Sequence, residues 1–185
     1  MNVLRLSLLI SVLVFTATCQ QKSPQQTLKP PASCPVTVPP ASPFAPPSPY
    51  PSEVGENTFW MGTEKLWTIL LKSGVRDGWE PREAGKENRV QPLTEKTVWL
   101  SADFDLRKEP HPDLKVTGRR LDGDARPLLT TEATNGFTGP TAENAAMVVG
   151  VYVPTPGCWE FTGEYRGQKL SYVVWVTAQS LKPEK

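Results

Sequence analysis

The fold of this chain is decided by the stretch Pro154-Thr-Pro-Gly-Cys-Trp-Glu-Phe-Thr-Gly-Glu-Tyr-Arg-Gly-Gln-Lys-Leu-Ser-Tyr-Val-Val-Trp-Val176. Trp159, Phe161 and Tyr165 alternate with polar residues, which is the period-two pattern of a strand with one buried face. A polar Arg-Gly-Gln-Lys segment follows, and its glycine can adopt the positive φ that a hairpin turn requires. Residues 170–177 are rich in valine and aromatic side chains, which favour a strand. The stretch therefore predicts a β-hairpin near the C-terminus.

The residues before the hairpin predict another strand and a corner. Met147 to Val153 is an apolar run, and it is ended by two prolines, which cannot donate to a sheet ladder. A strand, a Pro/Gly corner and then Gly-Cys-Trp-Glu-Phe are typical of the E–F corner of immunoglobulin-like sandwiches. Trp159 would anchor that corner, and Phe161 would enter the core.

The chain from residue 57 onward has the pattern of an all-β protein. Short apolar runs alternate with glycine, proline and charged turns, and no long amphipathic helix is evident there. In the run 65–71 we expect Trp67, Ile69 and Leu71 to face the core. Further strands are expected at 97–101, 114–121 and 126–131. We therefore expect an immunoglobulin-like β-sandwich of about seven to eight strands, preceded by a signal peptide and a proline-rich stalk.

The N-terminus has the features of an export signal. Arg5 is followed by an apolar run from Leu6 to Phe15 and then by small residues before Cys19. A cysteine in that place resembles the lipobox of bacterial lipoproteins, in which the cysteine is acylated. We assign residues 1–18 as a signal peptide and expect lipidation of Cys19, so that the protein is extracytoplasmic and membrane-anchored. Ordinary cleavage, giving a secreted or periplasmic soluble product, is the alternative.

Proline is concentrated behind the signal. Eleven of the 20 prolines lie between Pro24 and Pro51, and such a composition favours an extended, semi-rigid stalk. A proline motif for a partner's groove is the sharper alternative. The run Cys34-Pro-Val-Thr-Val38 is β-branched and is a candidate first strand. We therefore place a tether at 19–32 and the sandwich domain at 33–180, with a proline-rich segment at 39–57.

Two of the three cysteines are expected to pair. If Cys19 is acylated, Cys34 and Cys158 remain, an even number in an exported and therefore oxidising context. Cys158 lies on the strand face opposite the core residues, where an added edge segment can reach it. The bridge would dock Val36 and Val38 against the sheet. Two free thiols are the alternative.

The sequence offers little for catalysis or metal binding. His111 is the only histidine, and it has no nucleophile motif nearby, so we expect an exposed loop residue. Asp103, Asp105, Glu109 and Asp113 are close in sequence but lack the order of a calcium loop, and we expect a solvated polar loop. We therefore predict a protein that is not an enzyme, with no cofactor and no metal. The near balance of 20 basic and 19 acidic residues gives no basic stripe for a nucleic acid.

Two tryptophans are candidates for ligand contact. Trp60 and Trp79 both sit beside turn residues, and exposed tryptophans can stack on sugar rings or contact a partner. The alternative is that both fold back and cover the ends of the sandwich, because large exposed apolar patches are rare on monomers.

Three stretches carry a resemblance to a known group of proteins. The Cys-Pro-Val at residues 34–36, the Gly-Arg-Arg-Leu-Asp-Gly at 118–123 and the Pro-Thr-Pro-Gly-Cys-Trp-Glu at 154–160 resemble uncharacterised bacterial secreted proteins and lipoproteins. The resemblance covers most of residues 33–177 and implies bacterial origin and export. That family has no established activity, so it assigns no catalytic residue here.

Together these observations predict a cell-envelope lipoprotein with a non-enzymatic binding or structural role. Its expected partners are the membrane, through the lipid on Cys19, and an envelope protein or a glycan. A sensing or inhibitory domain acting on an envelope protease or a signalling partner is one alternative. An enzyme with an unrecognised site is the other.

Overall fold

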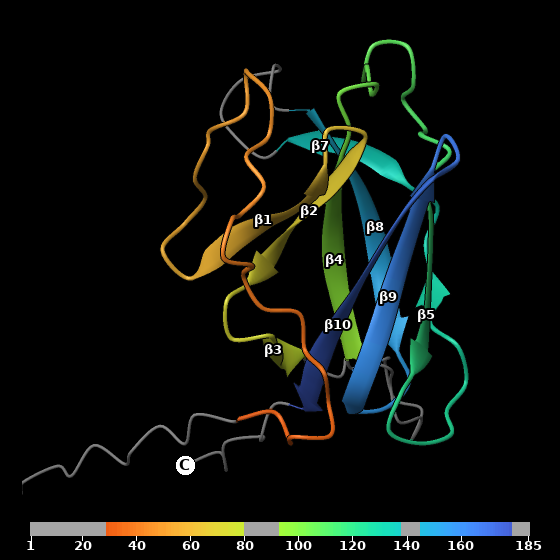
Figure 1. Cartoon of the computed structure of the whole chain (residues 1–185). Coiled ribbons are helices and arrows are strands. Elements are labelled where there is room, and N and C mark those ends of the chain that lie inside the picture. The colour runs from red at the N-terminus through yellow and green to blue at the C-terminus, as the bar shows by residue number, and fades with distance from the viewer. Residues whose placement is uncertain (1–28, 80–92, 138–144, 179–185) are drawn as a thin grey trace, which may run out of the picture.

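The structure is a computed structural model, and it describes residues 29–79, 93–137 and 145–178. These residues form strands and turns with no helix, as predicted for an all-β protein (Figure 1). The strands are β1 (Thr58–Thr63), β2 (Leu66–Leu71), β3 (Val75–Trp79), β4 (Leu93–Leu100), β5 (Lys115–Arg120), β6 (Leu129–Thr130), β7 (Thr134–Phe137), β8 (Ala145–Val153), β9 (Gly157–Tyr165) and β10 (Gln168–Ala178). The ten strands in the described ranges exceed the expected number, because β1, β3 and β7 were not predicted.

The strands form two sheets that lie face to face (Figure 1). The first sheet has the order β1-β2-β4-β8, and β6 and β7 both pair with β8. The second sheet has the order β3-β10-β9-β5. The pair β3–β10 is parallel, whereas the other pairs are antiparallel. The architecture is therefore sandwich-like, with its core between the sheets.

The predicted C-terminal hairpin is confirmed. β9 and β10 pair from Tyr165↔Gln168 to Gly157↔Val176, so the turn is shorter than the expected Arg-Gly-Gln-Lys segment. Arg166 has φ 49° and Gly167 has φ 78°. Positive φ at both central residues is the mark of a type I′ turn, whose twist matches that of the flanking strands.

The core is built from the hairpin and the strands opposite it. Trp159, Phe161 and Tyr165 of β9 are buried, as predicted, and they belong to one cluster with the apolar inner face of β8. Trp99 of β4 is fully buried at the centre. A Cβ at Gly163 would lie 2.4 Å from the ring of Trp99, so glycine is needed where the two sheets approach. Protein cores are packed to crystal-like density, so the core has no space for a larger side chain at this position.

The expected orientation of β2 is wrong for both Trp67 and Ile69. Leu66 and Leu70 belong to the core between the sheets, whereas Trp67 belongs to a second cluster on the outer face of the first sheet. Trp67 is nonetheless fully buried, because Phe44 and Tyr50 of the proline-rich region pack on its ring. Alternation predicts which residues share a face, but both faces of β2 are covered.

Residues 34–54, here called the strap, lie against the sandwich. The backbone N–H of Thr37 donates to Val173 O at 2.8 Å, and the N–H of Val173 donates to Thr37 Oγ1 at 2.9 Å. Further along, the hydroxyl of Tyr50 donates to Ala145 O at 2.8 Å. The strap contains no strand, so the expected first strand at 34–38 is an extended segment docked on β10.

The predicted disulfide is present between Cys34 and Cys158, whose Cα atoms lie 5.6 Å apart. Both cysteines are buried, and the bond fastens the strap to the start of β9. Val36 is docked, since a Cβ at Gly74 would meet its side chain at 2.6 Å. Val38 is 55 % exposed, so the expectation that it also docks is wrong.

The close contact of Trp99 with Gly163 predicts that a methyl group added at residue 163 destabilises the fold. Gly163→Ala should lower the free energy of unfolding by about 1–3 kcal/mol, because the buried indole has no room to move. Gly55→Ala is the matched control, since its new Cβ would meet Thr58 Oγ1 at an ordinary 3.6 Å. Urea denaturation measures both, and equal stability of the two variants would contradict the proposed contact.

The disulfide should supply a large part of the stability. It spans 124 residues, and the chain-entropy model gives a bridge of that length at most about 4–5 kcal/mol. The double substitution Cys34→Ala with Cys158→Ala should lower the unfolding free energy by up to that amount. Cys19→Ala is the control and should leave it unchanged. Two reactive thiols from Cys34 and Cys158 in the unfolded, unreduced protein would refute the bridge.

Candidate functional site

A pocket opens in the first sheet where β2 and β4 separate. These strands pair only at Trp67↔Leu100 and Thr68↔Trp99. Beyond Thr68, β2 turns away and the chain continues into β3, which joins the second sheet beside β10. Because the chain changes sheets here, a cavity of about 180 Å³ is left between β2 and β4.

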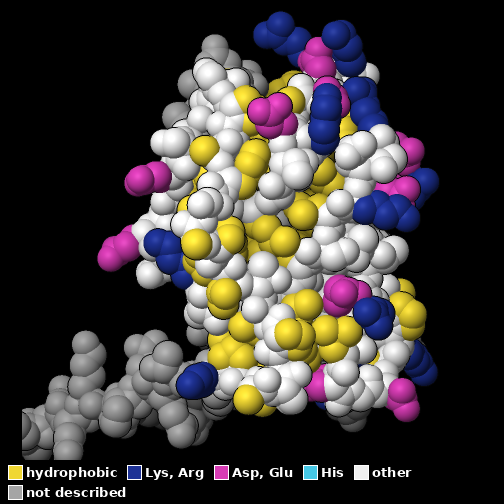
Figure 2. All heavy atoms as spheres, in the orientation of Figure 1, with side chains coloured by type: hydrophobic (Ala, Val, Ile, Leu, Met, Phe, Trp, Pro, Cys, Tyr) yellow, Lys and Arg dark blue, Asp and Glu magenta, His cyan; other side chains and the backbone are white. Residues whose placement is uncertain are grey.

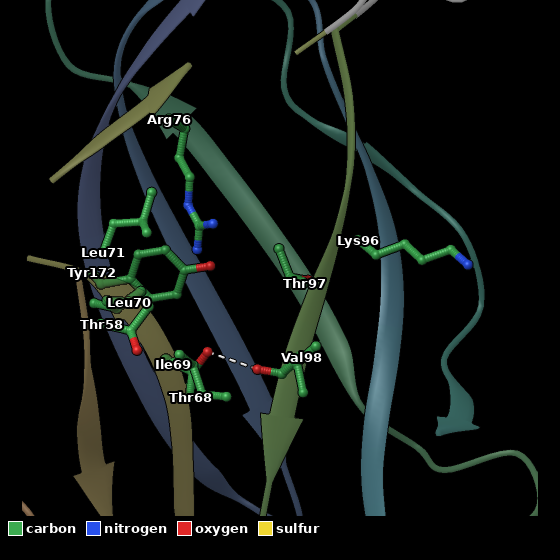
Figure 3. A pocket seen from close by; sticks show the side chains of 10 residues that line it. All are labelled: Thr58, Thr68, Ile69, Leu70, Leu71, Arg76, Lys96, Thr97, Val98 and Tyr172. Carbon is green, nitrogen blue, oxygen red and sulfur yellow. Dashed lines mark hydrogen bonds between the residues drawn. The ribbon is translucent and has the colours of Figure 1, made fainter. Parts of the chain in front are cut away.

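Both sheets contribute side chains to the pocket (Figure 3). β3 provides Arg76, β10 provides Tyr172, β1 provides Thr58, and β2 and β4 form the remaining walls. In Figure 3 the guanidinium group of Arg76 and the hydroxyl of Tyr172 lie close together, whereas Lys96 points away from them. The lining residues are Thr58, Thr68, Ile69, Leu70, Leu71, Arg76, Lys96, Thr97, Val98 and Tyr172.

Tyr172 is the unusual member of this set. Its side chain is 3 % exposed, and its ring stacks on Phe161 with the centroids 5.4 Å apart. No described residue forms a hydrogen bond with its hydroxyl group. Burial raises the pKa of Tyr172, the positive charge of Arg76 opposes that rise, and the negative charge of Glu95 adds to it. The hydroxyl is therefore neutral at physiological pH and can donate a hydrogen bond into the pocket.

Arg76 forms the second polar wall. Its Nη1 donates to Glu95 Oε1 at 2.8 Å, which joins β3 of the second sheet to β4 of the first. The two side chains are only 21 % and 26 % exposed, so water screens the pair less than it screens an ion pair on the open surface. A guanidinium has five N–H donors, and the contact with Glu95 leaves others for a ligand.

The threonine hydroxyls of the pocket already donate to carbonyl oxygens. Thr68 Oγ1 donates to Val98 O at 2.7 Å, and Thr58 Oγ1 donates to Gly55 O at 2.8 Å. Their oxygen lone pairs can still accept a hydrogen bond from a ligand. The pocket thus offers donors from Tyr172 and Arg76, acceptors from the threonines, and apolar contacts from the remaining walls.

Of the two tryptophans predicted as ligand contacts, Trp60 is a buried residue of β1. It is 3 % exposed, and its Nε1 donates to Pro51 O of the strap at 2.9 Å. This agrees with the alternative that it covers the sandwich, and its ring is not available on the surface. Trp79 ends β3, and its side chain lies outside the described residues, as does Cys19. Trp60 does not line the pocket.

His111 lies exposed in the connection between β4 and β5, as predicted. The four acidic residues of this connection each pair with another group. Asp103 pairs with Lys65, Asp105 with Lys108 and Asp113 with Lys115, while Glu109 accepts from the hydroxyl of Tyr165 and from Arg166. Within the described ranges, no three histidine, cysteine, aspartate or glutamate side chains are grouped to hold a metal ion.

Two stretches that carry the resemblance meet in space. Arg120 donates from Nε to Asp122 Oδ1 at 2.7 Å and from Nη1 to Thr155 Oγ1 at 3.3 Å. A Cβ at Gly157 would lie 2.7 Å from Arg120 Nε, so glycine is required beside it. The hydrogen bond from Arg120 lowers the pKa of Asp122, which stays ionised. These residues form a structural corner next to Cys158.

Sequence reasoning missed the pocket, although one signal pointed to it. Tyr172 occupies an inward position in an otherwise apolar strand, and a buried tyrosine hydroxyl usually has a partner. Arg76 gave no signal, because its proximity to Tyr172 depends on the change of sheet after β2.

Comparison of the chain with protein-family models, with curated proteins and with solved structures finds no match to any of them. No helix long and apolar enough to cross a membrane occurs in the part of the chain that the structure describes.

The two buried tyrosines should respond differently to loss of the hydroxyl. Tyr172→Phe should change the unfolding free energy by less than about 1 kcal/mol, because no described residue forms a hydrogen bond with its hydroxyl. Tyr165→Phe is the matched control and should lower stability by about 1–3 kcal/mol, since it removes the hydrogen bond to Glu109. Guanidinium unfolding measures both, and a comparable loss in Tyr172→Phe would mean that its hydroxyl has a partner.

Proposed function

We propose that this protein is an exported, immunoglobulin-like domain that acts as a non-enzymatic binding module of the bacterial cell envelope, held at the membrane by a lipid on Cys19. The Cys34–Cys158 disulfide is the observation that carries the export part of the proposal. Disulfides persist in oxidising compartments outside the cytosol. The export signal at the N-terminus gives independent support for the same location.

The sheet order supports the immunoglobulin-like assignment. An immunoglobulin domain has strands A, B, E and D in one sheet and C, F and G in the other. β2, β4 and β8 correspond to A, B and E, and the short β6 and β7 together take the place of D. β5, β9 and β10 correspond to C, F and G. β1 is an additional edge strand, and β3 extends the second sheet beside β10.

The corner before β9 supports the same assignment. The Nε1 of Trp159 donates to Thr155 O at 2.9 Å. An aromatic residue near the start of strand F that hydrogen-bonds to the backbone a few residues upstream is the arrangement of the tyrosine corner. The disulfide differs from that of antibody domains, because it joins the strap to β9 rather than two strands across the core.

The docking of the strap limits the distance between the domain and a membrane. Because Cys34 is fixed to β9, only the residues between Cys19 and Cys34 remain as a tether. An extended proline-rich segment spans about 3 Å per residue, which would keep the domain within about 50 Å of the bilayer. The pocket at the β2–β4 opening supports a binding role over a purely structural one.

Acylation of Cys19 is the experiment that tests the anchor. Intact-mass measurement of the protein from native membranes should show an N-terminal cysteine that carries acyl chains. Cys19→Ser should move the protein to the soluble extracytoplasmic fraction, while the matched Ser23→Ala variant should stay with the membrane. An unmodified, freely soluble wild-type protein from the native host would contradict the lipoprotein assignment.

A further inference from the structure

The polar groups of the β2–β4 pocket are suited to bind an oxygen atom of a ligand that accepts hydrogen bonds. The hydroxyl of Tyr172 and the guanidinium of Arg76 come from the second sheet and lie beside one another (Figure 3). Both can donate to the same ligand oxygen. The Tyr172 hydroxyl has no partner among the described residues and is held by a ring stacked on Phe161, so a ligand oxygen would complete its hydrogen bonding.

The ion pair of Arg76 with Glu95 disfavours an anion at the guanidinium group. Glu95 Oε1 lies 2.8 Å from Arg76 Nη1. Lys96 also lines the pocket, but it points away from the guanidinium and from Tyr172 (Figure 3). A carboxylate or phosphate placed beside Arg76 would also face the negative charge of Glu95. Like-charge contact at a partly buried site disfavours such ligands. A carbonyl oxygen can accept both hydrogen bonds without this repulsion.

The remaining walls suit an N–H group and a methyl group. The oxygens of Thr58 and Thr68 can accept from an N–H, and Ile69 and Val98 give apolar contact. The volume of about 180 Å³ is close to that of an engineered cavity of about 150 Å³ that holds benzene, a group of six heavy atoms. The pocket therefore holds a small group rather than a whole drug-sized ligand.

The shape of the opening favours a ligand that inserts a terminal group over a peptide chain that runs through the pocket. The gap closes where Thr68 pairs with Trp99. A peptide strand added between β2 and β4 would need to run on past this point, because edge-strand recognition depends on several successive backbone hydrogen bonds. A substituent that enters from the surface and ends inside the pocket meets no such obstacle.

From these observations we propose that the pocket binds the acetamido group of an N-acetylated amino sugar. The carbonyl oxygen accepts from Tyr172 and Arg76, the N–H donates to a threonine oxygen, and the methyl group contacts the apolar wall. The sugar ring stays outside the pocket. On the surface drawn in Figure 2, hydrophobic side chains gather in the middle, where β2, β4 and β10 lie in Figure 1, and charged side chains lie mainly toward the edges. The inference makes specific, and rests on, the binding role proposed above.

Titration with a monosaccharide tests the proposal directly. The ¹⁵N-labelled full chain, with its disulfide formed, is titrated with N-acetylglucosamine and followed by amide chemical shifts. Saturable shifts are expected at the pocket, around Thr68, Arg76 and Tyr172. Glucosamine and glucose lack the acetyl group and are the matched ligands, for which we expect at least tenfold weaker binding.

Two variants and one control assign the contact. Tyr172→Phe keeps the stacked ring and should weaken N-acetylglucosamine binding at least tenfold. Arg76→Lys keeps the charge opposite Glu95 but loses the planar donor group, and it should weaken binding as well. Tyr152→Phe removes a hydroxyl on β8 that does not line the pocket, and it should bind like the wild type.

Several outcomes would overturn the proposal. They are the absence of saturable shifts, equal binding of glucose, and full binding by both Tyr172→Phe and Arg76→Lys. Tighter binding of N-acetylglycine methylamide than of the sugar would assign the pocket to a peptide instead. Each of these results leaves acylation of Cys19 as a separate question, because that mass measurement does not depend on the pocket.

Discussion

The bond between Cys34 and Cys158 is the constraint on which the arrangement of this molecule depends. It fixes the strap to β9, and the backbone bonds of Thr37 with Val173 then carry the strap across β10. From there the strap reaches the outer face of the first sheet, where Tyr50 packs on Trp67. A proline-rich segment has little apolar surface of its own with which to offset the entropy of ordering. The covalent bond reduces that entropic cost, because it restricts the segment in the unfolded chain as well.

The same constraint is connected to the pocket through the crossing between the two sheets. Val36 packs against Gly74, the residue before β3, and Gly74 O accepts from the N–H of Trp175 on β10. The strap therefore holds the start of β3 on the second sheet. Arg76 follows two residues later and faces Tyr172 from that position. The opening between β2 and β4 is thus a consequence of a chain that changes sheets, and the strap stabilises the change.

Local pattern was sufficient for the hairpin and, together with the expected compartment, for the disulfide. The alternation of Trp159, Phe161 and Tyr165 gave the buried face of β9, because one face of that strand meets the core. Alternation failed for Trp67, since the strap buries the outer face of β2 as well. The burial of Trp60 under Pro51 was offered only as an alternative for the same reason. The pocket could not be predicted, because it depends on which strands separate, and pairing between distant strands is not encoded in local periodicity.

The stretches that carry the sequence resemblance concern the fold rather than the ligand. Arg120, Asp122 and Gly157 hold the corner beside Cys158, where the disulfide begins, and this corner has a structural role that any ligand would leave unchanged. Arg76 and Tyr172 lie outside those stretches. A chain that kept the corner but replaced these two residues would therefore keep the sandwich and lose the proposed contact with the acetamido group. In this architecture the fold and the specificity of binding depend on separate residues, so likeness in the corner is an argument for a shared fold and not for a shared ligand.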